Sequence, residues 1–128
     1  MRLLLDTHAF LWWVNDSPEL SRRARSAIAD QRNECFLSLA SCWEMAIKVS
    51  IGKLGLPTGV ERFIQGQLAA NWIRELPIDL AHVARAGLLP FHHRDPLDRL
   101  LAAQALEEDL AIVSADPVFR KYGVKHVW

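Results

Sequence analysis

Five acidic residues lie directly after short apolar segments or near the starts of predicted helices, at points where a parallel sheet would bring their carboxylates together. Asp6 ends the apolar run 3–5, and an ionised carboxylate closing a strand that is buried on both faces needs a partner charge, hydrogen-bond donors or a metal ion. In an open parallel sheet, ligands bind beyond the carboxyl ends of the strands. We therefore expect five acids to reach one edge of the sheet: Asp6, Glu44, Asp95, Asp98 and Asp116.

Carboxylates gathered at one edge repel one another and raise each other's pKa unless a cation neutralises them. A set of oxygen ligands suits Mg²⁺ or Mn²⁺, which bind a few carboxylates together with substrate phosphate. Such ions generate a hydroxide nucleophile from water and clamp the oxygens of a phosphate during in-line displacement. The acidic pattern thus predicts hydrolysis of phosphodiester bonds.

Helix capping offers a simpler interpretation of most of these acids taken singly. Asp95 and Asp116 each precede a proline, which is typical of an N-cap followed by proline at the first helical position. Ser41 and Glu44 have the spacing of a capping box, and Glu44 and Lys48 have that of an i, i+4 ion pair. Capping alone, however, does not require the acids to follow strand ends.

The elements that must position these acids are strands alternating with helices. Short apolar runs predict strands at residues 3–5, 35–37, 72–76, 111–113 and 125–127. Helical spacing predicts helices at 7–14 with Thr7 as N-cap, 20–28, 40–51, 60–70, 80–88 and 97–108, and one helical turn after Pro117. Such alternation indicates parallel strands with helices on both faces, which is a three-layer α/β sandwich.

Composition narrows the class of protein. The 128 residues suit one domain, and no apolar run approaches the ~20 residues of a membrane span. Fifteen basic and fifteen acidic residues cancel, so any nucleic acid must be held by local patches. The first residues lack the apolar core and cleavage site of a signal peptide, so we expect a cytoplasmic protein. Cys35 and Cys42 are expected to be reduced thiols, because a chain with its own core needs no disulfide.

Four segments occur along the chain in this order: LLLDTH, WEMAIK, HRDPLDRLLAAQA and SADP. Together they resemble the PIN-domain ribonucleases, and within them the VapC-type toxins of bacterial toxin–antitoxin pairs. The resemblance spans essentially the whole chain, 1–128. It implies a PIN-like α/β/α sandwich around a mostly parallel sheet of about five strands, and a Mg²⁺- or Mn²⁺-dependent endoribonuclease that uses a metal-activated water. The family's catalytic and metal-binding acids fall on Asp6, Glu44, Asp98 and Asp116.

The resemblance also implies supporting residues and partners. Ser114 takes the hydroxyl position beside the last acid, Thr7 supports the first, and Asp95 fits a helix cap or an outer-shell residue, with an exchange of roles between Asp95 and Asp98 left open. The substrate would be single-stranded or looped RNA, and the partners a VapB-like antitoxin covering the acidic edge and a second copy in a homodimer. Three cations could hold neighbouring phosphates or be solvated charges and partners of the acids: Lys48, Arg94 and Arg99.

Three alternatives remain beside this interpretation. The chain could be a PIN-like module that binds RNA or protein without cutting. It could be a different phosphohydrolase, although Asp6 is followed by Thr7 and His8 with no second acid two residues on, which disfavours an aspartyl-phosphate route. His92 and His93 could suggest zinc, but no spacing of cysteine and histidine fits a structural site.

Overall fold

A five-stranded sheet lies at the centre of the protein, in a computed structural model that describes residues 1–92 and 95–128. The strand order is β3-β2-β1-β4-β5, and each of the four pairings is parallel. The strands are β1 (Arg2–Leu5), β2 (Glu34–Ser38), β3 (Ile73–Leu76), β4 (Ala111–Val113) and β5 (His126–Val127). The edge strand predicted at 72–76 begins at Ile73, because Trp72 is the left-handed C-cap of the preceding helix.

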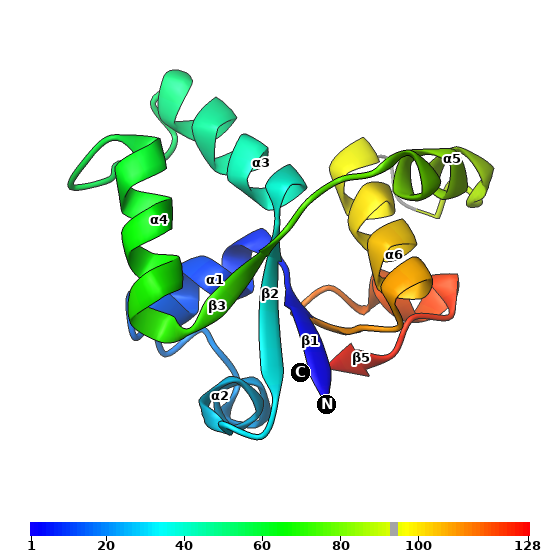
Figure 1. The fold of residues 1–128 in the computed structure, drawn as a ribbon, viewed down its shortest axis with the longest axis horizontal. Coiled ribbons are helices and arrows are strands. Elements are labelled where there is room, and N and C mark those ends of the chain that lie inside the picture. The colour runs from blue at the N-terminus through cyan, green and yellow to red at the C-terminus, as the bar shows by residue number, and fades with distance from the viewer. Residues whose placement is uncertain (93–94) are drawn as a thin grey trace.

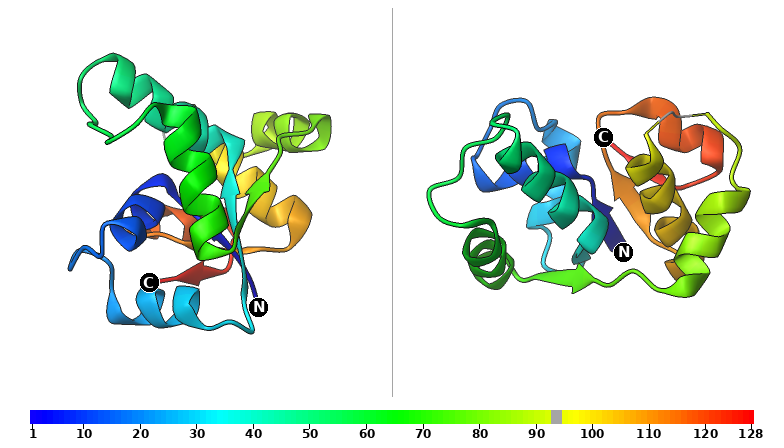
Figure 2. Two further views of the ribbon diagram at one scale, coloured as in Figure 1. Left: turned by 60° about the vertical axis from the view of Figure 1, so that its left-hand side comes forward. Right: turned by 90° about the horizontal axis from the view of Figure 1, so that it is seen from above.

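Helices cover both faces of this sheet (Figure 1). They are α1 (Thr7–Val14), α2 (Arg22–Ala29), α3 (Leu39–Ser50), α4 (Val60–Asn71), α5 (Leu80–Leu88), α6 (Pro96–Glu108) and the 3₁₀ helix η1 (Pro117–Tyr122). Helices α1 to α4 pack on one face, and α6 and η1 on the other. Seen from above, α3 and α6 lie on either side of β1 (Figure 2). The predicted α/β/α sandwich is confirmed.

Strand β1 is buried on both faces because its leucines alternate between the two cores. Leu3 and Leu5 pack under α1 to α4, whereas Leu4 points to the side of α6. All three side chains are fully buried. The unbroken apolar run therefore marks a central parallel strand, as the sequence predicted, and its carboxyl end carries Asp6.

Two helix caps differ from the predicted ones, because each strand runs directly into its helix. Asp6, not Thr7, caps α1: its backbone is extended and its carboxylate Oδ1 accepts a hydrogen bond from the backbone N–H of Ala9 at 2.7 Å. Ser38, not the Ser41–Glu44 pair, caps α3. With no loop residue between the elements, the last extended residue is also the N-cap.

The two proline-linked caps are confirmed. Asp95 Oδ1 accepts from the Leu97 N–H at 2.9 Å, with Pro96 as the first residue of α6. Asp116 Oδ1 likewise accepts from the Val118 N–H at 2.9 Å at the start of η1. Both acids are therefore fixed to the first turn of a helix.

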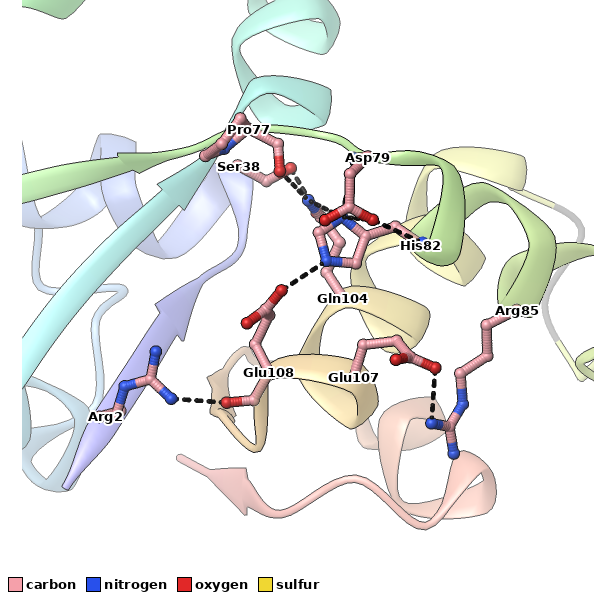
Figure 3. Close-up of polar contacts among 9 residues, drawn as sticks. All are labelled: Arg2, Ser38, Pro77, Asp79, His82, Arg85, Gln104, Glu107 and Glu108. Carbon is pink, nitrogen blue, oxygen red and sulfur yellow. Dashed lines mark hydrogen bonds and ion pairs between the residues drawn. The ribbon is translucent and has the colours of Figure 1, made fainter.

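A buried polar network ties α5 to α6 (Figure 3). His82, which is almost fully buried, accepts the Asp79 N–H at Nδ1 over 3.1 Å, and its Nε2 lies 2.9 Å from Glu108 Oε1. Gln104 continues the network: its Oε1 accepts from the Ser38 hydroxyl, and its Nε2 donates to the carbonyl of Pro77. The network joins the carboxyl ends of β2 and β3 to the outer helices.

None of the helices within residues 1–92 and 95–128 has the length and apolar character needed to span a membrane.

Candidate active site

The five predicted acids all line one cavity at the carboxyl edge of the sheet. Its volume is about 240 Å³. Asp6 follows β1, Glu44 lies on α3, and the other acids begin α6 and η1. The side chains around the cavity are those of Asp6, Thr7, His8, Glu44, Asp95, Asp98, Asp116 and Phe119. The parallel topology thus brings together acids from four segments of the chain.

Asp6 is the most buried of these acids, with 9% of its surface exposed. Burial raises the pKa of its carboxyl above the usual value, and the nearby charge of Glu44 adds to the rise. Hydrogen bonds from Ser114 and from the Ala9 N–H, together with the charge of His8, act in the opposite direction but do not outweigh the burial. An ionised Asp6 is therefore costly in the protein without a further cation.

Glu44 is held at both of its carboxylate oxygens. The hydroxyl of Thr7 donates to Oε1 at 2.5 Å, and Lys48 Nζ lies 3.4 Å from Oε2. Thr7, at the first position of α1, thereby fixes the carboxylate across the gap between α1 and α3. Lys48 forms the predicted i, i+4 ion pair, so its charge faces an acid of the cavity.

Ser114 connects the first acid with the last. Its fully buried hydroxyl accepts a hydrogen bond from the Asp116 N–H at 3.0 Å and hydrogen-bonds the side chain of Asp6. Because the oxygen accepts from the amide, its proton is available to the carboxylate. The hydroxyl predicted beside the last acid therefore orients Asp6 as well.

The predicted cations and histidines near the cavity have different environments. The guanidinium carbon of Arg99 lies 4.3 Å from the ring centroid of Phe91, a contact that the sequence analysis did not foresee. The His92 ring packs edge-on against Tyr122, with centroids 5.1 Å apart. His93 and Arg94 lie outside the described residues.

The residues around the cavity fit a hard divalent cation. The acids offer carboxylate oxygens, which Mg²⁺ and Mn²⁺ prefer. The cost of keeping Asp6 ionised while buried is also what an adjacent cation removes. The oxygen ligands around the cavity and the raised pKa of Asp6 therefore both fit a divalent cation.

A second group of potential metal ligands lies away from this cavity, at the junction of α5 and α6. Ligand atoms of Asp79, His82 and Glu108 lie within 4.8 Å of one another and could hold a metal ion. This group was not predicted from the sequence, although the Asp-x-x-His spacing of residues 79 and 82 is visible there. Both ring nitrogens of His82 are engaged in the hydrogen bonds described above (Figure 3), and these contacts explain the cluster as part of the α5–α6 network.

A larger groove of about 770 Å³ lies at the opposite edge, where β2 and β3 begin. Trp13, Cys35 and Trp72 are among its lining residues. Its two acids already have cationic partners: Asp30 pairs with Arg32, and Glu34 with Arg74. Ligands of open parallel sheets bind at the carboxyl ends of the strands, so the smaller acidic cavity is the better candidate for chemistry.

Comparisons with known proteins agree with this fold. Residues 3–125 match the PIN domain family. Ribonuclease VapC22 of Mycobacterium tuberculosis is 31% identical over 121 residues, which cover 94% of this chain and 91% of that protein. VapBC2 of Rickettsia felis, solved bound to a promoter DNA fragment, has a similar fold, with a TM-score of 0.69, 16% identity and coverage of 98% of this chain and 97% of the other. A toxin–antitoxin complex from Klebsiella pneumoniae has a TM-score of 0.58, with 16% identity and coverage of 89% and 86%.

Proposed function

The chain belongs to the PIN domain family, and we propose that it is a Mg²⁺- or Mn²⁺-dependent endoribonuclease that acts as the toxin of a toxin–antitoxin pair. The observation that carries this proposal is the single cavity lined by five carboxylates at the carboxyl edge of the sheet. The similarity to Ribonuclease VapC22 over most of both chains supports RNA as the substrate.

Four carboxylates would hold the cation: Asp6, Glu44, Asp98 and Asp116. A Mg²⁺ or Mn²⁺ ion held there would supply positive charge for the phosphate and would make water a stronger nucleophile near neutral pH. The chain's own residues set the geometry of the ligands. The Ala9 N–H and the Ser114 hydroxyl hold Asp6.

Thr7 and Lys48 orient the second carboxylate of this set. Their contacts with opposite oxygens of Glu44 restrict its rotation. Asp95 has a capping bond of the same kind as Asp6 and Asp116, and its outer position in this proposal rests on the family resemblance alone. Pre-orientation of this kind lowers the entropy lost when the substrate phosphate binds.

The size of the cavity bears on how RNA would bind. Its 240 Å³ equals the liquid volume of about eight water molecules. This space suits a hydrated ion and one phosphodiester group, so bases and flanking phosphates would contact the surface around the opening. An unstacked single strand can adopt such a path, whereas a duplex cannot present its backbone so closely.

Cleavage of RNA by the purified protein tests this function. Single-stranded and looped RNA are incubated with the wild-type chain and with Asp6→Asn, in Mn²⁺, in Mg²⁺ and in excess chelator. We expect cleavage by the wild type with metal, and a loss of at least about 100-fold in the variant or in chelator. Equal cleavage with chelator would refute the metal mechanism, and RNA binding without any turnover would favour the non-cleaving module.

We also propose an antitoxin partner that covers the acidic edge. The similarity in fold to a toxin–antitoxin complex supports it. Co-expression with the product of a neighbouring short open reading frame tests it. A stable complex in which RNA cleavage is suppressed is the expected result, and undiminished cleavage in that complex would contradict coverage of the cavity.

A homodimer is the third part of the proposal. Leu39, Trp43 and Ile47 repeat every four residues on α3 and are exposed, and an apolar stripe of this kind is typical of a protein contact. Light scattering on the wild type and on Trp43→Ser tests it. We expect a dimer that the substitution weakens, whereas a wild-type monomer at all concentrations would exclude the homodimer.

A further inference from the structure

We propose that Phe91 and Arg99 form a stacking platform for an RNA base at the rim of the acidic cavity. The inference rests on the proposed function, because it assumes that RNA reaches the cavity. Arg99 follows Asp98, whose side chain lines the cavity. A base bound on the platform would therefore belong to a nucleotide close to the scissile phosphate.

Phe91 presents an aromatic ring to solvent. It is 79% exposed, and the guanidinium of Arg99 covers one side of it at 4.3 Å. Single-stranded RNA is bound largely by stacking of its bases on aromatic rings and guanidinium planes. The exposed face of Phe91 offers this kind of surface, and the guanidinium of Arg99 contacts the opposite face of the ring.

Arg99 brings hydrogen-bonding capacity that the described residues do not use up. Its Nε is buried and has no hydrogen-bond partner in ranges 1–92 and 95–128. Buried donors without a partner are rare in proteins. The Nε itself is too buried for a bound nucleotide to reach, but the planar guanidinium carries further donors that suit phosphate or base oxygens.

Charge gives a second reason for a cation at this place. RNA phosphates approaching five carboxylates are repelled until cations offset the field. Lys48 already pairs with Glu44. Arg99, stacked on a ring instead, keeps its positive charge beside the cavity and combines attraction for phosphate with a platform for the base.

Binding of RNA without turnover tests the platform. The probe is a fluorescein-labelled, unstructured RNA of about 12 nucleotides, and its anisotropy is measured with Ca²⁺ in place of Mg²⁺. Phe91→Ala is expected to weaken binding by about 5- to 150-fold, the usual loss of one stacked base. Phe91→Tyr keeps the ring and should bind within about twofold of the wild type, whereas Phe91→Leu should resemble the alanine variant.

Two further measurements separate stacking from a structural role. Arg99→Gln should lower the slope of log affinity against log salt by about 0.7, the value for one phosphate contact on a single strand. Trp72→Ala is the matched control: Trp72 is 78% exposed and lines the groove at the opposite edge. This variant should bind RNA as the wild type does.

The outcomes distinguish the platform from the proposed function. Unchanged affinity in Phe91→Ala, or full rescue by leucine, would refute the platform even if the enzyme cuts RNA. A change of oligomeric state in Phe91→Ala would also refute it, since the ring would then serve a protein contact. Ring-dependent RNA binding by a protein that never cleaves RNA would leave the platform standing and overturn the nuclease. In the active enzyme, Phe91→Ala should raise KM with little change in kcat.

Discussion

Replacing Asp6 by asparagine is expected to stabilise the metal-free protein and to abolish its response to Mg²⁺ or Mn²⁺. The carboxylate is 9% exposed, and its burial raises its pKa. Asparagine keeps an oxygen that can accept the Ala9 N–H, now at 2.7 Å, while it removes the buried charge. The substitution therefore relieves a cost to folding and removes a ligand in one step.

The size of the metal response can be worked out from the length of the chain. A ligand at 100 times its Kd stabilises the folded state by about 2.7 kcal/mol. With an unfolding entropy of about 2.1 cal/mol/K per residue, 128 residues give about 0.27 kcal/mol/K. Saturating metal should therefore raise the wild-type Tm by about 10 °C, and this rise should be absent from Asp6→Asn.

The pH dependence has a definite sign. Because the folded pKa of Asp6 lies above the usual aspartate value of 3.8, the folded state holds this proton more tightly than the unfolded chain does. The free energy of unfolding of the metal-free wild type should therefore fall as pH rises from below 3.8 through the folded pKa of Asp6. Asp6→Asn lacks this contribution, so the difference in unfolding free energy between the metal-free variant and the metal-free wild type should grow over the same pH interval.

Thermal unfolding followed by circular dichroism, with and without metal and across this pH range, measures both effects. Asp109→Asn is the matched control, because that carboxylate is 86% exposed and asparagine tolerates its left-handed backbone. Two results would refute the reasoning: a metal-induced rise in Tm that survives in Asp6→Asn, or a metal-free variant that is less stable than the wild type above the folded pKa.

Three further predictions concern other contacts. Thr7→Val should reduce RNA cleavage by about tenfold or more, because the lost hydrogen bond to Glu44 is charge-assisted and worth about 1.5–3 kcal/mol. Cleavage assays should show that Thr7→Ser cuts RNA at a rate near that of the wild type. Equal cleavage rates for Thr7→Val and the wild type would contradict a role of Thr7 in positioning Glu44. His82→Phe should cost about 2–3 kcal/mol in urea unfolding, because it removes the hydrogen bonds to the Asp79 amide and to Glu108. An unchanged midpoint would show that this network does not stabilise the contact of α5 with α6. Burial raises the pKa of Cys35 and of Cys42 to about 11, so both thiols should stay protonated at pH 7. They should therefore react slowly with a thiol reagent until the protein unfolds. Fast labelling of the native protein would contradict this.

The sheet could be predicted from the sequence because its strands have a direct physical signature. A run such as Leu3 to Leu5 has no polar alternation, and only a strand covered on both faces buries it fully. The run 111–113 has the same character, and it forms β4 with the predicted bounds. Alternation with helices then fixed the parallel pairing.

Helix α5 shows where such reasoning stops. Its apolar residues recur at helical spacing, yet Leu80, Val83 and Leu88 are exposed. The buried residue of this helix is His82, because its hydrogen bonds reach Glu108 and the Asp79 amide. Periodicity identifies a helix, but the face that is buried depends on polar partners that are distant in the sequence.

The gathering of the acids could be predicted from topology, whereas their contacts could not. That Asp6, Glu44 and Asp98 line one cavity follows from parallel strands ending at one edge. The hydrogen bond of Thr7 to Glu44 joins residues 37 positions apart, and no local spacing encodes it. The pairing of Phe91 with Arg99 was likewise invisible, because no spacing within one predicted helix or strand links the two residues.

Helix capping and the proposed metal binding, which were alternatives at the level of the sequence, are compatible in this structure. Asp6, Asp95 and Asp116 each cap a helix through one carboxylate oxygen and each also line the cavity. A cap fixes the rotamer of the acid and sets it at the positive end of a helix, which favours its ionised form. The capping bonds therefore hold these carboxylates in place, as the proposed cation site requires. An acid that caps a helix directly after a buried strand is thus better placed to bind a metal ion than an acid on a flexible loop.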